Sequence, residues 1–162
     1  MTFHTADLCD DHEDKLQIVA PLFSIYGGRN RFHGRISTIK AHEDNSLVRE
    51  AVAEPGEGRV LVIDGGGSLR RAMLGDMLAE KATKNGWSGV LINGCLRDSE
   101  AIGELDLGVK ALATLPLKTE KRGEGQRDIP VHFADATFTP GHWLYSDPDG
   151  IVICAEQLPL AR

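Results

Sequence analysis

The chain has 162 residues, of which 41% are hydrophobic and 26% are charged, and this composition is typical of one globular domain spanning residues 1–162. It has 18 Lys and Arg residues and 24 Asp and Glu residues. The resulting net charge of -6 argues against direct binding to nucleic acid. Because no run of about 18 apolar residues is present and residues 1–5 lack the basic and apolar regions of a signal peptide, we expect a cytoplasmic protein without a membrane partner.

The first third of the chain predicts two helices and one strand. Thr5 precedes a run of acids, as a helix cap would, so a helix should begin there. Residues 35–41 alternate between apolar and polar and are rich in β-branched side chains, which predicts a strand. Residues 45–54 place their apolar side chains on one helical face, and Asn45 is the expected cap.

The middle of the chain alternates between predicted strands and helices. Strands are expected at residues 59–64, 90–93 and 109–117, and the first of these is apolar throughout, as in a strand covered on both faces. Helices are expected at residues 72–85, with Met73, Met77, Leu78 and Ala82 as the apolar stripe, and at residues 98–105. This alternation predicts parallel pairing.

The last third has a different pattern. Residues 118–128 are highly charged and contain two glycines, which indicates an exposed loop. Four short strands follow, at residues 130–133, 136–139, 143–145 and 151–154. Because hairpin-type turns separate them at residues 140–141 and 147–150, we expect antiparallel or mixed pairing at this end of the sheet.

A glycine cluster at residues 65–67 directly follows the strand at 59–64. Glycines in this position can let backbone amides approach an anion. The spacing matches neither a dinucleotide fingerprint nor a P-loop. The cluster is therefore interpreted either as turn geometry or as the lining of a pocket.

Two short segments are candidates for chemistry. Gly75-Asp76-Met77-Leu78 lies near a helix start, where free N–H groups and the helix dipole favour a carboxylate. Arg97-Asp98 follows the strand at 90–93, and ligands of open α/β sheets bind at the carboxyl ends of strands. Arginine suits a carboxylate, and aspartate suits Mg²⁺ or Mn²⁺. Alternatively, Asp76 and Asp98 are helix caps and Arg97 forms a surface ion pair.

The remaining reactive residue types show no recognisable pattern. The six histidines are scattered, without metal-site spacing, and no nucleophile motif is present. Cys9, Cys95 and Cys154 are far apart in sequence and are expected to be buried, reduced thiols. Lys110 and Lys118 are expected at the surface.

Several motifs taken together resemble the RraA-like family over essentially the whole chain. In chain order they are DLCD (7–10), PLF (21–23), YGGR (26–29), EDN (43–45), VLVIDGGGS (60–68), RRA (70–72), GD (75–76), GCLRD (94–98), LDLG (105–108) and DGI (149–151). The resemblance implies an α/β fold, a swivelling β/β/α domain with a mixed central sheet flanked by helices. It also implies assembly into a homotrimer.

The resemblance also implies a function. Family members include divalent-metal-dependent aldolases that cleave 4-hydroxy-4-methyl-2-oxoglutarate to pyruvate, with oxaloacetate decarboxylation as a secondary activity. By this resemblance Asp98 would hold Mg²⁺ or Mn²⁺, and Arg97 with Gly75, Asp76, Met77 and Leu78 would bind a small 2-oxo acid. Arg97 and Asp76 would be catalytic, with Asp76 orienting the water that takes the proton from the C4 hydroxyl.

The same resemblance leaves a second function open. Other members are described as protein-binding inhibitors of ribonuclease E, and an acidic surface would suit a basic segment of that partner. Members viewed as pure regulators tend to lack the acid after the arginine, whereas this chain keeps Asp98. In the other direction, longer aldolases have a C-terminal extension with an acidic residue for the neighbouring subunit's metal site, and this sequence ends at Arg162.

Overall fold

The computed structural model describes residues 2–160, and within them ten strands form one mixed sheet. The helices are α1 (Thr5–His12), the short 3-10 helix η1 (Glu13–Lys15), α2 (Ser46–Val52), α3 (Asp76–Lys84) and α4 (Ser99–Gly103). The strands of this sheet are β1 (Leu16–Ile18), β2 (Ser24–Ile25), β3 (Phe32–Lys40), β4 (Val60–Asp64), β5 (Ala72–Leu74), β6 (Gly89–Leu96), β7 (Gly108–Thr114), β8 (Gln126–Arg127), β11 (Trp143–Asp147) and β12 (Gly150–Cys154). A separate hairpin consists of β9 (Val131–Phe133) and β10 (Ala136–Phe138).

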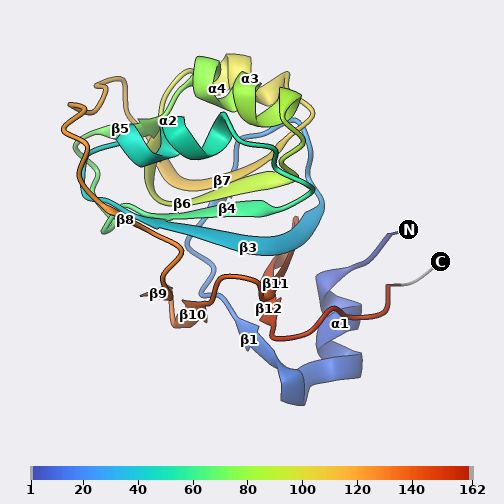
Figure 1. Ribbon diagram of the computed structural model, residues 1–162. Helices are drawn as coiled ribbons and strands as arrows, with labels where there is room; N and C mark the ends of the chain where they lie inside the picture. The colour runs from blue at the N-terminus through green and yellow to red at the C-terminus, as the bar shows by residue number, and fades with distance from the viewer. Residues whose placement is uncertain (1, 161–162) are drawn as a thin grey trace.

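The sheet has a parallel centre and antiparallel edges. Its main path runs β1-β12-β11-β3-β4-β6-β7-β2, and β3, β4, β6 and β7 pair in parallel. The strands β1, β12, β11 and β3 pair antiparallel. Helices α2, α3 and α4 cover one face of the parallel centre, and α1 lies beside β11 and β12 at the other end of the molecule (Figure 1). The predicted α/β fold with a mixed sheet flanked by helices is confirmed.

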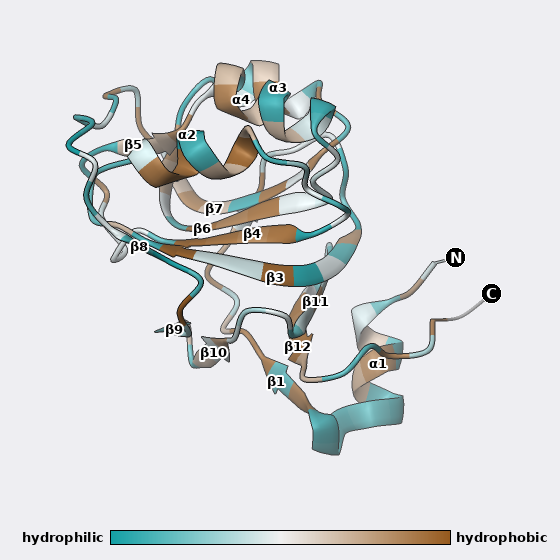
Figure 2. Cartoon of the chain, in the orientation of Figure 1, coloured by the Kyte–Doolittle hydropathy of each residue, from teal (hydrophilic) through white to brown (hydrophobic). Residues whose placement is uncertain are grey.

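Strand β4 shows why the centre of the sheet forms. All five of its residues are buried, with Leu61 and Ile63 in the core under the helices and Val60 and Val62 in the core on the opposite face. Side chains of a strand alternate between faces, so an unbroken apolar run fits only a strand covered on both sides. The hydropathy colouring shows the same concentration of apolar residues along the central strands (Figure 2).

The helix predicted at 72–85 is wrong in its first part. Residues 72–74 form β5, which pairs in parallel with β6, and the helix begins only at Asp76. Met73 is therefore a buried strand residue, and Met77, expected in the apolar stripe, is 74% exposed. The apolar spacing could not separate the two elements, because a three-residue buried strand shows no period of its own.

Two predicted helix caps are also corrected. Helix α1 begins at Thr5 as predicted, but Thr5 is its first residue, and the Thr5 amide and hydroxyl donate to the two carboxylate oxygens of Asp147 at 2.7 and 2.6 Å. Asn45 stands at the cap position of α2, but its side chain forms no cap hydrogen bond. Instead, Oδ1 of Asp44 accepts from the Ser46 amide at 2.9 Å.

The remaining differences concern short elements. β1 and β2 were not predicted, and β8 lies inside the stretch predicted as a loop. The turn at 147–150 joins β11 to β12 as predicted, with Asp147 opposite Gly150. The turn at 140–141 does not close a hairpin, because β10 pairs with β9 while β11 pairs with β3 and β12. Within residues 2–160, no helix has the length and apolar character needed to cross a bilayer.

Candidate functional site

Parallel pairing of β5 with β6 brings the two predicted segments together. Leu74, the last residue of β5, lies opposite Leu96, the last residue of β6, and the Arg97 amide donates to the Leu74 carbonyl at 2.9 Å. Gly75 and Arg97 therefore leave the sheet side by side at the carboxyl ends of their strands. This edge is where open α/β sheets bind ligands.

Gly75 leaves room for the close approach of the two segments. A Cβ atom at this position would lie 2.9 Å from Oδ2 of Asp98 and 3.5 Å from Nε of Arg97. Its backbone is extended, with φ -125° and ψ -176°, so the requirement is one of space and not of backbone conformation. Glycine at this position lets the start of α3 lie against the Asp98 carboxylate without displacing it.

The Asp98 carboxylate is turned toward α3. Its Oδ2 accepts a hydrogen bond from the Asp76 amide at 3.0 Å and lies 4.0 Å from Nε of Arg97. Asp98 precedes α4 with a left-handed backbone, φ 57° and ψ 40°, but its side chain makes no cap hydrogen bond to that helix. A left-handed non-glycine residue costs about 1 kcal/mol, and here it turns the carboxylate toward the other helix.

The helix-cap interpretation is therefore wrong for Asp76, whereas Asp98 does stand at the cap position of α4 but makes no side-chain cap hydrogen bond there. Asp76 is the first residue of α3, where the cap position belongs to Gly75, and it is one of the residues that line a cavity. The first turn of a helix leaves N–H groups without intrahelical partners. With the Asp76 amide bound to Asp98, the amides of Met77 and Leu78 are the remaining donors of that turn.

The cavity has a volume of about 260 Å³ and is lined by all six predicted site residues. These are Gly75, Asp76, Met77, Leu78, Arg97 and Asp98. The Arg97 and Asp98 side chains are 40% and 38% exposed, so both remain accessible to a ligand. Arg97 and Asp98 also line a second hollow of about 250 Å³ together with residues 114–116, which follow β7.

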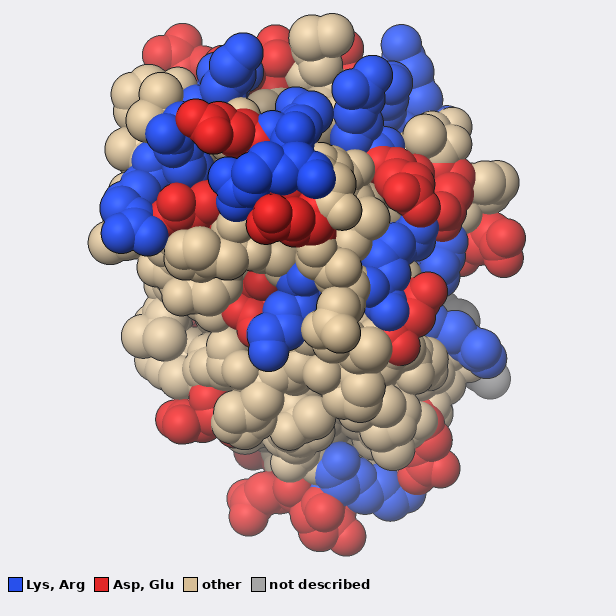
Figure 3. All heavy atoms as spheres, turned by 60° about the vertical axis from the view of Figure 1, so that its left-hand side comes forward, with Lys and Arg blue, Asp and Glu red and all other residues tan. Residues whose placement is uncertain are grey.

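Four basic side chains in this cavity were missed by the sequence analysis. Arg49 of α2, Lys81 of α3, and Lys118 and Lys121 of the loop after β7 line the same space. One of them had a usable signal, since Lys81 lies four residues after Met77 and so on the same helical face. Lys118 is exposed as predicted, yet it faces the cavity. Figure 3 shows Lys and Arg side chains gathered with acids in the upper part of one face of the molecule.

The glycine cluster at 65–67 serves turn geometry. Gly66 and Gly67 have φ of 68° and 72°, a region that side chains disfavour. The amides of Gly65 and Gly67 donate to the Asn93 carbonyl at 3.1 Å, and the Gly66 amide donates to Oδ1 of Asp64 at 3.0 Å. Because these donors are used within the protein, the turn interpretation is confirmed and the anion-pocket alternative is not supported.

Lys110 is buried, although it was predicted to lie at the surface. It lies on β7 with 3% exposure, and its Nζ donates to the carbonyls of Asp147 at 2.7 Å and Gly150 at 3.3 Å. Burial lowers the pKa of this amine to about 8, against the raising effect of the nearby Asp147 carboxylate. The cysteines are free thiols, with Cys95 and Cys154 buried as predicted and Cys9 only partly so.

The fold and this cavity define a mixed α/β protein with a cavity, lined by basic and acidic side chains, at the carboxyl ends of two adjacent parallel strands. Comparison with known proteins narrows the class. Residues 5–153 match the RraA-like family, Aldolase/RraA. The chain therefore belongs to the RraA-like family.

Three relatives span nearly the whole chain. A protein of Ectopseudomonas mendocina named "Putative 4-hydroxy-4-methyl-2-oxoglutarate aldolase" is 57% identical over 99% of each chain. A structure described as the RNA-processing inhibitor RraA from Thermus thermophilis is 41% identical, with a TM-score of 0.95, covering 100% of this chain and 98% of that one. A structure described as S-adenosylmethionine:2-dimethylmenaquinone methyltransferase from Geobacillus kaustophilus is 46% identical, with a TM-score of 0.95, covering 96% and 97%.

Proposed function

We propose that the chain is a divalent-metal-dependent aldolase that cleaves 4-hydroxy-4-methyl-2-oxoglutarate to pyruvate and also decarboxylates oxaloacetate. The observation that carries this proposal is that Arg97, Asp98 and the first turn of α3 line one cavity. The name of the 57% identical relative supports the same activity. The three relatives described above carry names that imply three different activities. The choice among these activities therefore depends on the chemistry of the site.

The substrate's 2-oxo acid end would lie between Arg97 and α3. The guanidinium offers a planar pair of donors that matches a carboxylate. The amides of Met77 and Leu78 and the positive end of the α3 dipole act on the same negative charge. Lys81, one turn further along α3, adds to the positive potential of the cavity.

The acidic residues of the cavity fit a hard divalent cation held by few protein ligands. Within residues 2–160, no group of three His, Cys, Asp or Glu side chains is arranged to hold a metal ion. Asp98 and Asp76 supply carboxylate oxygens, and Mg²⁺ commonly binds to one or two carboxylates while keeping several waters. This donor set suits Mg²⁺ or Mn²⁺. When bound, the ion would supply positive charge at the keto oxygen and carboxylate of the substrate.

The proposed reaction breaks the bond between C3 and C4. The C4 hydroxyl loses its proton, the C4 oxygen forms a carbonyl, and the electron pair of the broken bond moves into the enolate of pyruvate. Protonation of that enolate at C3 gives one pyruvate, and the C4 fragment is the second. Arg97 and the α3 amides are positioned before the reaction to stabilise the enolate, an effect of several kcal/mol, on the order of 3. Asp76 is proposed to orient the water that accepts the hydroxyl proton.

Oxaloacetate would react through the same enolate. Its C3–C4 bond breaks with loss of CO₂, and the electron pair again moves toward the C2 oxygen. No proton needs to leave a hydroxyl group in this case. The decarboxylation should therefore depend on Arg97 but be less sensitive to replacement of Asp76 than the aldol cleavage.

Replacing Arg97 with lysine tests the proposed substrate contact. Lysine keeps the charge but loses the planar pair of donors, so kcat/KM for pyruvate release from both acids should fall by at least about tenfold, or 1.4 kcal/mol. Arg29→Lys is the matched control, because Arg29 pairs with Asp106 outside the cavity. Equal activity of the Arg97→Lys variant and the control would refute this assignment.

Methyl transfer is less well supported by the cavity. S-adenosylmethionine carries a positive sulfonium, and five basic side chains line this space: Arg49, Lys81, Arg97, Lys118 and Lys121. Like charges in a partly enclosed site oppose binding. The glycine amides at 65–67, which could have approached a nucleotide, already bond within the protein.

We also keep inhibition of ribonuclease E as a second candidate. It is favoured by the 41% identical RraA structure and by the net charge of -6, which suits a basic partner segment. A pull-down with purified ribonuclease E should then recover a complex that weakens with salt and survives Asp98→Ala. Recovery of no complex at low salt would exclude this role.

Homotrimer formation is likewise proposed from family membership. Sedimentation of the purified chain should give three times the mass of the 162-residue subunit. A monomer at the concentrations used for assay would contradict it.

A further inference from the structure

A groove of about 320 Å³ lies between α1, β1 and β12, at the other end of the molecule from α2, α3 and α4 (Figure 1). Ala6 and Cys9 of α1 line one side, Ile18 and Pro21 line the other, and residues 149–152 close it. No residue lines both this groove and the cavity of the proposed active site. The groove is therefore a separate feature of the surface.

The β1 side of the groove exposes apolar side chains. Five large hydrophobic side chains of residues 2–160 are exposed, and two of them belong to this side: Ile18 at 54%, and Leu22, which directly follows Pro21, at 56%. In the described part of the chain, β1 is the outermost strand of the main sheet path and pairs only with β12. Apolar side chains exposed at the edge of a sheet and beside a groove indicate a surface on which another chain can pack.

Helix α1 and the short helix η1 give this end of the molecule a negative charge. Lys15 is the only Lys or Arg in residues 5–15, and its Nζ lies 3.0 Å from Oε1 of Glu156. The same eleven positions hold five acids, all exposed: Asp7, Asp10, Asp11, Glu13 and Asp14. Among residues 2–160, no ion pair involves any of these five.

Two of these carboxylates lie on the side of the helix that lines the groove. Asp10 follows Ala6 by four residues and Glu13 follows Cys9 by four, so each pair shares a helical face. Burial raises the pKa of the Cys9 thiol, and the nearby carboxylates, Asp10 and Glu13 among them, raise it further. Asp149 lines the groove from the β12 side. The groove therefore combines an apolar lining with carboxylates on two sides.

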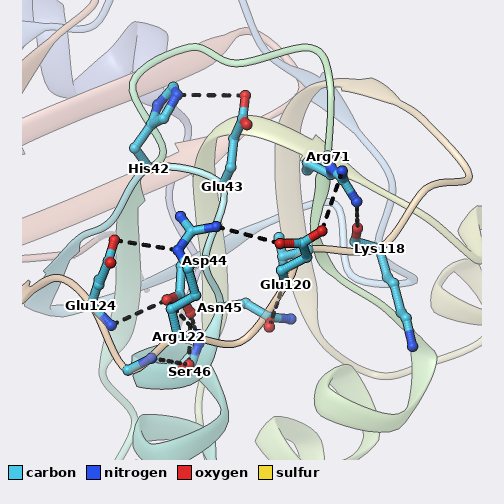
Figure 4. A network of polar contacts seen from close by, with 12 residues as sticks. His42, Glu43, Asp44, Asn45, Ser46, Arg71, Lys118, Glu120, Arg122 and Glu124 are labelled. Atoms are coloured by element: carbon cyan, nitrogen blue, oxygen red, sulfur yellow. Dashed lines mark hydrogen bonds and ion pairs between the residues drawn. The ribbon is translucent and has the colours of Figure 1, made fainter.

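The acids of the loop after β7 are used differently. Glu120 lies 3.8 Å from Arg71, and Glu124 lies 3.4 Å from Arg122, so both are neutralised within the chain (Figure 4). The carboxylates of α1 and η1 lack such partners. Their negative potential is therefore available to a cation from outside the molecule.

We propose that the groove between α1 and β1 binds a segment of a partner protein in which basic side chains alternate with apolar ones. Apolar side chains of that segment cover Ile18 and fill the groove, and basic ones pair with Asp10, Glu13 and Asp149. A second copy of this chain placed symmetrically is opposed, because it would bring the same carboxylates together. The inference goes beyond both proposed functions, since it uses no residue of the proposed active site and no named partner.

Peptide binding tests the proposal. A short fluorescein-labelled peptide of alternating Lys and Leu is titrated with the full chain. A Lys–Ser peptide, which lacks the apolar groups, and a Glu–Leu peptide of opposite charge serve as comparisons. Fluorescence anisotropy should show that the Lys–Leu peptide binds at least about tenfold more tightly than either. Equal affinity for the Lys–Leu and Lys–Ser peptides would overturn the proposal, because charge alone would then explain the binding.

Variants of the groove localise the binding. Asp10→Lys combined with Glu13→Lys should weaken the Lys–Leu complex at least about fivefold, and Ile18→Ser should weaken it about threefold. Glu80→Lys combined with Glu100→Lys is the control, because both acids are exposed, helical and outside the groove and the cavity. Thermal unfolding should show that all variants are folded. Equal weakening by the control, which changes the net charge by the same amount, would overturn the proposal.

Cys9 gives a local readout in the unmodified chain. It is partly exposed, whereas Cys95 and Cys154 are buried, so alkylation by iodoacetamide should occur first at Cys9. Saturating Lys–Leu peptide should slow this alkylation at least about threefold by covering the thiol, and the Glu–Leu peptide should leave the rate unchanged. An alkylation rate that bound Lys–Leu peptide does not change, or the absence of saturable binding, would overturn the proposal.

Discussion

Gly75 affects both the packing of the chain and the geometry of the proposed site. It separates strand β5 from helix α3, and it lets the Asp98 carboxylate reach the first amide of that helix. In the sequence, Gly75 is a candidate from its place near a helix start, and the resemblance to a family assigns it to substrate binding. The geometry adds the physical reason, since a Cβ atom here would lie only 2.9 Å from Oδ2 of Asp98.

Gly75→Ala should therefore damage the site more than the fold. The added Cβ would force the Asp98 carboxylate to move, so kcat/KM for pyruvate release should fall at least about tenfold, with about 1 kcal/mol lost from the free energy of unfolding. Gly150→Ala is a suitable control, because a Cβ there meets nothing within 4 Å. Retention of wild-type activity by Gly75→Ala would show that the contact is unimportant.

Lys110 gives a pH-dependent test of the fold. Its folded pKa of about 8 lies below its usual value of 10.5, so between these values the unfolded chain binds more protons than the folded one. Stability from this group therefore rises with pH across that window, by roughly 2 to 3 kcal/mol. The free energy of urea unfolding of wild type relative to Lys110→Met should increase from pH 7.5 to pH 10. Parallel curves would mean that the amine is not perturbed.

At the scale of elements, the strength of the local pattern decided what the sequence could predict. The four consecutive apolar residues of β4 and the turn before β12 have clear signals, and both were predicted. The boundary between β5 and α3 has none, because Met73 and Met77 fit one helical stripe although the first is buried in a strand and the second is exposed. The β9–β10 hairpin closes through Ala134 and Asp135, both with positive φ, where glycine or asparagine would be usual.

The hydrogen bonds by which Asp44 joins the start of α2 to the loop at 118–125 should contribute measurably to the free energy of unfolding. Burial would raise the Asp44 pKa, but these hydrogen bonds outweigh it and lower the pKa to about 2. Asp44→Asn replaces an acceptor oxygen that serves several amides, and the lowered pKa corresponds to about 2 kcal/mol at neutral pH. The variant should lose about that much in urea unfolding. In the wild type this contribution is present above about pH 4 and disappears as the pH falls toward 2.

Asp14→Asn is the matched control, because Asp14 is exposed. It should leave the unfolding free energy within about 0.5 kcal/mol of the wild type. If the Asp44→Asn variant is equally stable, the buried carboxylate does not hold the loop in place.

At the scale of the whole molecule, charge is distributed unevenly. The net charge of -6 correctly describes the chain as acidic, but it gave no sign of the basic cavity. Arg49, Lys81, Lys118 and Lys121 are spread over 73 positions of sequence, from 49 to 121, and only the fold brings them to one space. The predicted site was found through adjacent strand ends, whereas Lys118 and Lys121 reach the cavity on a loop whose path had no sequence signal.

The most direct test of the proposed function is pyruvate release from 4-hydroxy-4-methyl-2-oxoglutarate, measured with Mg²⁺, with excess chelator, and with Asp98→Ala in Mg²⁺. We expect activity in the first case, with losses of at least about a hundredfold, or 2.7 kcal/mol, in the other two. Activity that survives removal of the metal, or that survives Asp98→Ala, would contradict the proposed function.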